Sequence, residues 1–309
     1  MNRLKLQRRS VLVGLGGLAA SATLPSFAAG KRATLQISEI APGILVAAGA
    51  GSNAAFVKGT GASFAIDTGP AGQARDVHRW LREQSKSAPL EVAFNTHWHP
   101  AHTGANELLR RDGVEIVAHE NTRLWMGAPV TSRWNEEQFP ARAPSALPTR
   151  TFYTTDRVEI GGHVAESGYL LQPHTDGDIY VRLPNANVLF TGDVFTTDRY
   201  PITDPATLGW IGGLATATDQ LLKLTDAQTR VVPGSGPVAD RAALEAQLKM
   251  VTTVRDRLYG MLREGKSVEE MLAAKPTAEF DARWGDPASF IRAAFAGMVA
   301  HVRQIPGIV

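Results

Sequence analysis

Three histidines stand within six residues of the chain, in the segment Asn-Thr-His-Trp-His-Pro-Ala-His-Thr-Gly at residues 95–104. They are His97, His99 and His102, and the protein has eight histidines in all. Neutral imidazole is the commonest metal ligand in proteins, and a His-x-His pair on an irregular segment lets two rings converge on one ion. The spacing therefore predicts a metal site. Ala101 is an apolar residue inside this otherwise polar cluster.

Three further polar residues stand where strands are predicted to begin or end. His174 comes just before a predicted strand, Asp193 follows the apolar segment 188–190, and Ser235 follows the strand predicted at 230–232. Side chains at the ends of several strands can converge on one site. We therefore expect these residues to lie close to the histidine segment.

Short apolar segments separated by Gly-rich turns predict the elements that position these residues. Strands are expected at residues 34–37, 44–48, 54–57, 63–66, 90–94, 115–118, 152–155, 158–160, 164–171, 178–183, 187–190 and 230–232. Helices are expected at residues 71–84, 103–111, 120–126, 213–224, 239–263, 268–274 and 287–302. Residues 127–149, which contain four prolines, are predicted to form a long ordered loop of the kind that often acts as a lid. This order predicts a mixed sheet with helices packed outside it.

Five features in this order resemble the metallo-β-lactamase-fold superfamily, which includes glyoxalase II. They are Asp67-Thr68-Gly69, the segment from His97 to His102, the isolated His174, Gly192-Asp193, and Pro233-Gly234-Ser235-Gly236. The resemblance covers about residues 34–238 and implies an α/β fold, a four-layer αββα sandwich with the metal site at one edge. Together with the N-terminal residues discussed below, it predicts three parts of the chain: an export signal at 1–28, the fold domain at 29–238 and a helical extension at 239–309 packed on that domain.

The resemblance also implies a ligand set. By position, His97, His99 and His174 match the first metal site of the family, and Asp193 matches the carboxylate that often bridges two metals. The second metal site would need residues 101, 102 and 235. Only His102 is retained there, because Ala101 stands in place of an aspartate and Ser235 in place of a histidine.

One metal suffices for hydrolysis, because zinc held by three imidazoles with an open position lowers the pKa of bound water to about 7. We therefore predict a metal-dependent hydrolase with one Zn²⁺ per chain, Fe or Mn being the other metals considered. Its substrate would be a small ester, thioester, lactone or amide, with Asp193 and His102 as catalytic residues. The alternatives are a non-catalytic periplasmic binding or accessory protein and a mononuclear iron sulfur-oxygenase, for which the retained ligands are also suited.

The other histidines and Asp67 are given structural roles. Asp67 is expected to be a turn or cap residue. His119 is expected to begin the helix at 120–126, with an additional pair of metal ligands, His119 and Glu120, as the alternative. His78 and His301 fall in predicted helices and His163 in a turn, so we assign them to structure or solvent.

Aromatic residues in predicted loops near the motif could form a rim for an apolar or ring-containing substrate, with core packing as the alternative. The predicted substrate-binding residues are Trp98, Trp125, Trp134, Tyr200 and Trp210. Trp80 and Trp284 are expected to pack in the interior.

The first 28 residues resemble a twin-arginine (Tat) export signal, with Arg8-Arg9 before an apolar, Gly-rich segment and small residues around Ala28. This predicts a periplasmic or secreted protein without a membrane span after signal removal. Removing residues 1–28 lowers the basic residues from 32 to 28 against 30 acidic ones, a net charge of −2 in place of +2. No basic stripe for nucleic acid remains.

The chain contains no cysteine, which excludes disulfides, thiolate nucleophiles and iron–sulfur clusters. The helices after residue 239 carry apolar residues on one face, among them Leu244, Leu248 and Val251. These helices either cover the sheet or pair with a second copy, so a homodimer is compatible with the sequence.

Overall fold

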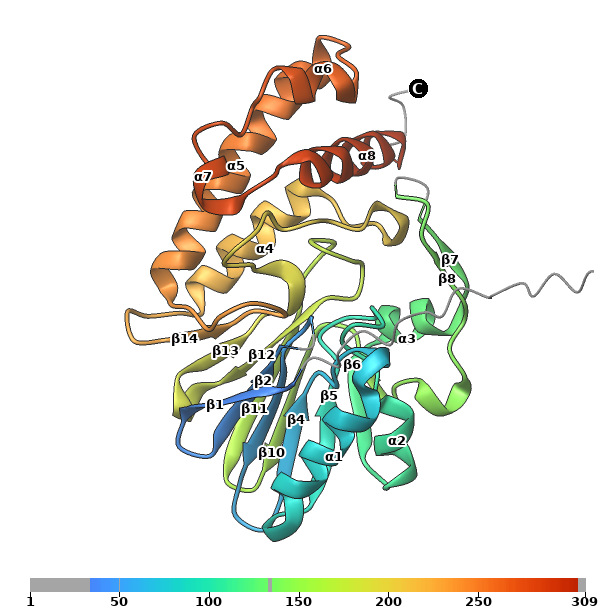
Figure 1. The fold of residues 1–309 in the computed structure, drawn as a ribbon, viewed down its shortest axis with the longest axis vertical. Helices are drawn as coiled ribbons and strands as arrows, with labels where there is room; N and C mark the ends of the chain where they lie inside the picture. The colour runs from blue at the N-terminus through green and yellow to red at the C-terminus, as the bar shows by residue number, and fades with distance from the viewer. Residues whose placement is uncertain (1–33, 50, 133–134, 305–309) are drawn as a thin grey trace, which may run out of the picture. The chain divides into compact units, whose positions relative to one another are not determined.

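Two β-sheets lie face to face in the computed structural model, which describes residues 34–49, 51–132 and 135–304 (Figure 1). The first sheet has seven strands in the order β1-β2-β3-β4-β5-β6-β9. Strands β1 to β4 pair antiparallel, whereas β4, β5, β6 and β9 run parallel. The strands are β1 (Gln36–Ala41), β2 (Ile44–Ala48), β3 (Ala54–Lys58), β4 (Ser63–Ile66), β5 (Leu90–Phe94), β6 (Glu115–His119) and β9 (Arg150–Phe152).

The second sheet has five strands in sequence order. Its neighbours pair antiparallel except for β13 and β14, which are parallel. The strands are β10 (Thr155–Ile160), β11 (His163–Tyr169), β12 (Ile179–Leu183), β13 (Val188–Phe190) and β14 (Arg230–Val232). Parallel strands end at the same edge of a sheet, so the segments that follow β4 and β5, and those that follow β13 and β14, gather at one edge of each sheet.

The inner faces of the two sheets form an apolar core. Phe64 and Phe94 of the first sheet are fully buried and meet edge to face, with ring centroids 6.1 Å apart. Val181 and Phe190 of the second sheet belong to the same cluster of contacting side chains. Burial of this apolar area is the main force that holds the sheets together.

Helices cover the outer face of the first sheet. On α1 (Ala74–Gln84) the buried residues Val77, Trp80 and Leu81 share one face, as a helix period of 3.6 requires. They pack against outward residues such as Phe56 of β3, together with Leu109 of α2 (Asn106–Arg111). With both faces covered, β4 is buried along its whole length. Trp80 therefore packs in the interior, as expected.

A second group of helices covers the outer face of the second sheet (Figure 1). Leu189 of β13 and Val231 of β14 belong to one cluster with side chains of α4, α5 and α8, and Trp284 lies in the same cluster. The helices of this layer are α4 (Ile211–Lys223), α5 (Arg241–Arg263), α6 (Val268–Ala273), α7 (Asp281–Trp284) and α8 (Ala288–Gln304). The layers thus run helix, sheet, sheet, helix, and the predicted four-layer αββα sandwich with C-terminal helices is confirmed.

The segment 127–149 differs in part from the predicted loop. After α3 (Glu120–Gly127) it forms a hairpin of β7 (Val130–Thr131) and β8 (Gln138–Phe139), followed by the short 3-10 helix η3 (Pro144–Ala146). Two-residue strands carry no sequence periodicity, which is why the hairpin was not predicted. The hairpin is anchored by Phe139, whose ring meets that of Trp98 edge to face at 5.1 Å.

Within the described ranges, no helix combines the length and apolar character that crossing a membrane requires. Residues 1–28, the predicted export signal, lie outside the described part of the chain.

Candidate metal centre

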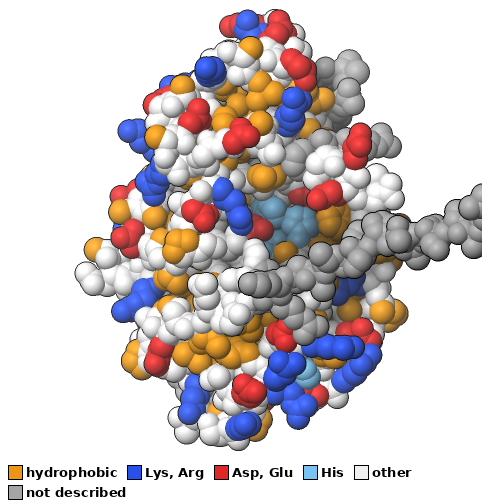
Figure 2. Space-filling view, viewed as in Figure 1, with side chains coloured by type: hydrophobic (Ala, Val, Ile, Leu, Met, Phe, Trp, Pro, Cys, Tyr) orange, Lys and Arg blue, Asp and Glu red, His pale blue; other side chains and the backbone are white. Residues whose placement is uncertain are grey.

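Four side chains from three separate segments converge at the edge of the sheets. His97 and His99 follow β5, His174 precedes β12, and Asp193 lies in the 3-10 helix η5 (Gly192–Val194) after β13. One ligand atom from each lies within 4.8 Å of those of the others. Figure 2 shows histidine side chains reaching the surface at one place, beside hydrophobic side chains. The structure thus brings together the four residues that were predicted as metal ligands.

The histidine segment is held in place by a buried amide network. The side chain of Asn106 in α2 donates to the Asn95 side chain at 2.7 Å and to the Ala146 carbonyl at 3.0 Å. Its oxygen accepts from the Thr68 hydroxyl at 2.9 Å. All these groups are buried, so each hydrogen bond also avoids the cost of an unsatisfied polar atom. The network joins the segment after β4 to the one after β5.

Hydrogen bonds at their outer nitrogens fix the rings of His99 and His174. His99 Nε2 lies 3.3 Å from the Oδ2 atom of Asp204, and His174 Nδ1 lies 2.6 Å from the carbonyl oxygen of Ile202. A carboxylate and a carbonyl only accept, so each of these nitrogens carries the proton. In the neutral imidazoles, the lone pairs are therefore on His99 Nδ1 and His174 Nε2.

The tautomer of His97 follows from two neighbours. Its Nδ1 atom lies 3.1 Å from the Thr96 hydroxyl, and that hydroxyl donates its own proton to the Oδ2 atom of Asp67 at 2.8 Å. Thr96 can then only accept from the ring, so His97 Nδ1 carries the proton and Nε2 has the lone pair.

The three lone pairs of the rings point into one small space. His99 Nδ1 lies only 2.9 Å from His174 Nε2, although neither neutral ring has a proton to place between them. His97 Nε2 is buried and has no hydrogen-bond partner among the described residues. Unshared lone pairs at this separation repel, and a buried unpaired nitrogen is costly. Three imidazole nitrogens and a carboxylate are the donor set that a cation such as zinc requires, so the residues present fit a metal.

Asp193 completes the donor set. Its Oδ2 atom lies 3.9 Å from His97 Nε2 and 3.8 Å from His174 Nε2. Burial alone would raise the pKa of Asp193, but the neighbouring histidines, His102 first, hold that pKa well below its ordinary value. The carboxylate is therefore ionised at neutral pH.

Glycines on either side let Asp193 approach the histidines. A Cβ atom added at Gly234 would lie 2.1 Å from Asp193 Oδ1, and one at Gly192 would lie 2.7 Å from the Thr96 hydroxyl. Gly192 also has a φ of +54°, which disfavours other residues. The Gly-Asp and Pro-Gly motifs are thus required by close packing around the carboxylate.

His102 is held between two carboxylates and does not join the ligand set. Its Nδ1 atom lies 2.8 Å from Asp67 Oδ2, and its Nε2 atom lies 3.3 Å from Asp193 Oδ1. Burial alone would lower the pKa of His102, but the two carboxylates raise it to about 10. Asp67, which was expected to be only a turn or cap residue, sits in a turn with a φ of +55° and positions both His102 and Thr96.

The three positions of a second metal site do not form a ligand set. The Ala101 carbonyl accepts a hydrogen bond from the Ser52 hydroxyl at 2.5 Å. The Ser235 hydroxyl is in close contact with the guanidinium of Arg199. His102 has both ring nitrogens beside carboxylates. In the described ranges, His97, His99, His174 and Asp193 form the single convergent group of side chains that could hold a metal ion.

Sequence reasoning missed Asp204 and Thr207. Thr207 donates to Asp204 Oδ2 at 2.7 Å and accepts from the Trp98 indole nitrogen at 3.2 Å. A hydrogen-bonded chain thus runs from Trp98 through Thr207 and Asp204 to His99. Burial would raise the pKa of Asp204, but its hydrogen bond with His99 and further hydrogen bonds keep that pKa below the ordinary value. The Asp204-Pro205 pair signals a turn, and nothing in it points to a histidine 105 residues away.

Two of the predicted substrate-binding aromatics lie beside the centre. Trp98 and Trp125 line an apolar pocket together with Phe139 of β8. The Trp98 ring lies 4.4 Å from that of His99, measured between ring centroids. Trp98 is also 3% exposed, so it serves as packing and as pocket wall at once.

The other predicted aromatics do not line this pocket. Tyr200 is buried in the helical layer, stacked 5.0 Å from the Phe290 ring, and its hydroxyl donates to Asp281 at 2.8 Å. Trp210 stacks on His301 of α8 with ring centroids 3.7 Å apart. Tertiary packing of the C-terminal helices draws both rings away from the predicted rim. Trp134 lies outside the described residues.

The remaining histidines have local partners. His119 caps α3 by accepting from the backbone N–H of Asn121, and its ring stacks on Tyr169 at 4.0 Å. His78 of α1 pairs with Asp112 at 2.7 Å. His163, which was expected in a turn, is the first residue of strand β11, and its Nε2 atom lies 3.1 Å from the Lys58 carbonyl oxygen.

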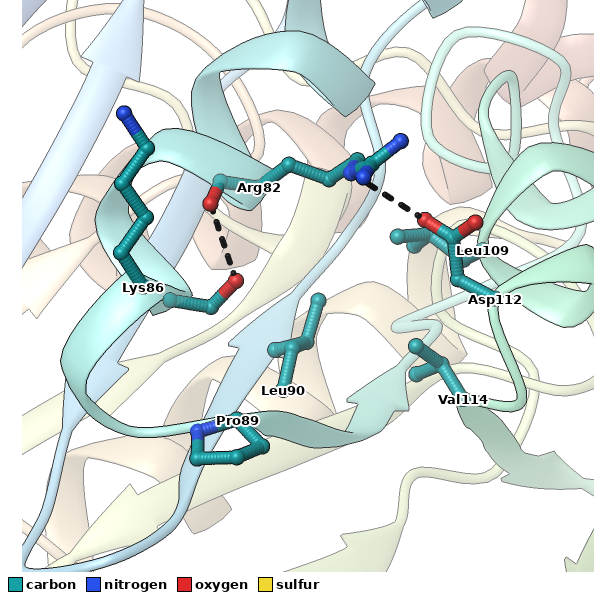
Figure 3. Close-up of a pocket in the computed structure, with 8 residues that line it drawn as sticks. Arg82, Lys86, Pro89, Leu90, Leu109, Asp112 and Val114 are labelled. Atoms are coloured by element: carbon teal, nitrogen blue, oxygen red, sulfur yellow. Dashed lines mark hydrogen bonds and ion pairs between the residues drawn. The ribbon is translucent and has the colours of Figure 1, made fainter.

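A separate surface hollow of about 460 Å³ lies at the opposite end of β5 (Figure 3). It is lined by residues such as Leu90, at the start of β5, and by Arg82, whose guanidinium lies 3.8 Å from Asp112. None of the four candidate ligands lines it. The four candidate metal ligands therefore lie away from this hollow, at the other end of the strands.

Solved structures share this architecture. A metallo-β-lactamase from Pontibacter korlensis superposes with a TM-score of 0.57 at 22% identity, covering 71% of this chain and 99% of its own. A stereoselective inverting sec-alkylsulfatase from Pseudomonas sp. gives a TM-score of 0.64 at 15% identity, covering 88% of this chain and 51% of its own. At these identities the likeness establishes the fold alone.

A curated protein is also similar to this chain in sequence. A hydroxyacylglutathione hydrolase from Erythrobacter litoralis (strain HTCC2594) is 27% identical over 136 residues, which span 43% of this chain and 43% of that protein. The chain thus matches less than half the length of this relative. The family model described as the metallo-beta-lactamase superfamily matches residues 48–256. This match spans more than half of the chain, and the protein therefore belongs to the metallo-β-lactamase superfamily.

Proposed function

We propose that this protein is a metal-dependent hydrolase with one zinc ion, held by His97, His99, His174 and Asp193. The observation that carries the proposal is the pair of opposed lone pairs on His99 Nδ1 and His174 Nε2, 2.9 Å apart. Only a cation or an added proton relieves that repulsion. The substrate classes we propose are small esters, thioesters, lactones and amides, each of which has a carbonyl group open to hydrolysis.

The proposal of a single metal is supported by the residues at the second position. Ala101 has no ligand atom, and Ser235 contacts Arg199. His102 is engaged by Asp67 and Asp193. When bound, a zinc ion supplies an acidified water and polarises the bond to be broken.

Two side chains of the protein itself are proposed to orient the reacting groups and to transfer protons. Asp193 Oδ2 faces the donor set, where it serves as the fourth ligand or accepts a proton from the attacking water. His102 keeps Asp193 in this orientation through its contact with Oδ1, and it carries a proton that a leaving group can receive. Both are therefore proposed as catalytic residues.

Export to the periplasm or beyond is part of the proposal. It is supported by the twin arginine at Arg8-Arg9, the apolar segment after it and the small residues near Ala28. The chain has no cysteine, so an exported protein of this sequence is stabilised without disulfides. Fractionation of cells that express the full chain, with and without Arg8→Lys and Arg9→Lys, tests this part.

The site itself is tested by metal analysis and a substrate panel. We expect about one zinc per chain in the purified protein, and hydrolysis of at least one ester, thioester, lactone or amide. His99→Ala should abolish both, whereas His78→Gln, which changes a histidine far from the centre, should abolish neither.

The outcomes separate the other two functions that fit the same residues. Metal-loaded protein without turnover on any substrate favours a binding or accessory protein. The presence of Ala101 and Ser235 in place of two metal ligands supports this alternative. Iron in anaerobically purified protein, with oxygen uptake on adding persulfide, favours an iron sulfur-oxygenase. Protein that binds no zinc, iron or manganese above background contradicts the proposed hydrolase.

A further inference from the structure

An apolar pocket of about 300 Å³ adjoins the candidate metal centre. Its walls come from the histidine segment, from α3 and from the segment that begins at β8. The residues that matter for the argument are Trp98, Trp125, Met126, Phe139, Pro140 and Arg142. The pocket lies next to the metal ligands, because the ring of His99 is 4.4 Å from that of Trp98 and 6.1 Å from that of Phe139.

The walls of the pocket offer a ligand little but apolar surface. The indole N–H of Trp98 is engaged by Thr207 at 3.2 Å, and that of Trp125 donates to the Asp176 carbonyl at 3.0 Å. Neither tryptophan donor is therefore free for a ligand. A small, aromatic-lined pocket of this kind suits a ring or a short branched alkyl group.

Arg142 is the charged residue of this pocket. Its guanidinium has one long hydrogen bond, to the Thr103 hydroxyl at 3.3 Å. No carboxylate in the described part of the chain forms an ion pair with it, and the nearby Glu107 pairs with Arg111 at 2.6 Å. The residue is half-buried, and desolvation by burial lowers the pKa of Arg142 by more than the nearby Glu107 carboxylate raises it. A guanidinium has five N–H donors, so most of its capacity is unused.

The position of Arg142 also relates it to the metal ligands. Thr103, which accepts from Arg142, donates in turn to the backbone carbonyl of His99 at 3.1 Å. The guanidinium thus lies two hydrogen bonds from the main chain of a candidate ligand. A partly desolvated cation that forms no ion pair among the described residues, at the rim of an apolar pocket, is stabilised most by an anion that enters with an apolar group.

We propose that the substrate is an anion with an apolar body the size of one ring. The pocket takes the apolar body, and Arg142 pairs with the anionic group, which leaves the reactive bond at the four convergent ligands. This inference rests on the proposed function, because it assigns the substrate class of the same site.

Binding of an unreactive probe tests it without any need for turnover. Zinc-loaded full-length protein is titrated by calorimetry with 3-phenylpropionate, with the neutral 3-phenylpropanamide, and with acetate. We expect the phenyl acid to bind about ten-fold more tightly than either control. The difference from the amide measures the charge-assisted hydrogen bond, and the difference from acetate measures the burial of the phenyl ring.

Variants identify the residues responsible. Arg142→Gln should weaken the phenyl acid about ten-fold and leave the phenyl amide unchanged. Phe139→Ala should weaken both, and Arg263→Gln, an exposed arginine on α5, should weaken neither. Arg142→Lys retains the charge without the bidentate geometry and should fall between wild type and Arg142→Gln.

Three outcomes overturn the inference. One is equal affinity for the phenyl acid and the phenyl amide. Another is an affinity for 3-phenylpropionate that is the same in Arg142→Gln as in the wild type. That result would mean that the carboxylate binds the metal instead of Arg142. The third is no binding of the acid at millimolar concentration. Turnover without this selectivity refutes the pocket assignment alone, and selective binding by a protein without turnover refutes only the hydrolase.

Discussion

The Nδ1 atom of His99 lies 2.9 Å from the Nε2 atom of His174, while each ring donates its proton to an acceptor on its far side, Asp204 for His99 and the Ile202 carbonyl for His174. The two rings are therefore oriented so that their lone pairs meet. In metal sites of proteins such outer hydrogen bonds set both the tautomer and the direction of the ligating histidines.

Asp204 should accordingly control metal affinity. Asp204→Asn keeps the side-chain shape but removes the charge that holds the His99 N–H. We expect the zinc affinity to fall about ten-fold or more, measured by competition with a fluorescent chelator. Asp219→Asn, which removes a carboxylate paired with Lys223 on α4 at 2.7 Å, is the matched control. Equal affinities for the two variants would mean that Asp204 has no part in the centre.

Gly234→Ala should damage the centre by steric contact. The new Cβ atom would lie 2.1 Å from Asp193 Oδ1, so the carboxylate or the turn must move. We expect a clear loss of zinc affinity and of any turnover. Gly260→Ala in α5 meets nothing within 4 Å and should leave both unchanged, with a small gain in helix stability. Wild-type zinc affinity in Gly234→Ala would contradict the geometry of the Asp193 segment.

Rebuilding the second metal position should require three changes. Ala101→Asp with Ser235→His restores the missing ligand types, but Arg199 contacts the Ser235 hydroxyl and occupies the space beside it. We expect the double variant to keep about one zinc per chain and the triple variant with Arg199→Ala to reach about two, by metal analysis. A second zinc in the double variant would show that Arg199 moves away at little cost. One zinc in the triple variant would mean that the pairing of His102 with Asp67 prevents its use as a ligand.

The buried ring of His119 should make the free energy of unfolding fall as the pH is lowered into mild acid. Burial lowers the pKa of His119, although the hydrogen bond with the Tyr153 carbonyl opposes this effect. In the unfolded chain the ring titrates near its ordinary pKa of about 6.5. The stability is thus fully present above that value and is lost as the pH falls toward the lower pKa of the folded state, by at most about 1.4 kcal/mol per pH unit.

His119→Asn isolates this contribution, because asparagine can still accept from the N–H of Asn121 as a helix cap. Urea unfolding at pH 7.5 and at lower pH should give a wild-type stability that falls more steeply than that of the variant. Parallel pH profiles for the two proteins would show that the ring is not desolvated. Other groups titrate in both proteins alike and cancel in the difference.

Much of the fold was readable from the sequence because it follows local periodicity. Strands β3 and β4 are short apolar segments between turn residues, and α1 has its apolar residues at helical spacing. The hairpin of β7 and β8 was not readable, because two-residue strands have no period. Its position depends on the contact of Phe139 with Trp98, far away in the sequence.

The sequence by itself determined which histidines and which aspartate stand near strand ends and in what order, a pattern that predicts metal chemistry. The resemblance to the family adds the prediction that Ala101 and Ser235 mark the loss of one of two metal positions. Only the tertiary structure decided how these side chains are oriented. Asp204 meets His99, Arg199 meets Ser235, and Tyr200 lies in the helical core instead of on a rim. These contacts join segments far apart in the chain, and packing between layers selects them, so no local pattern of residues records them.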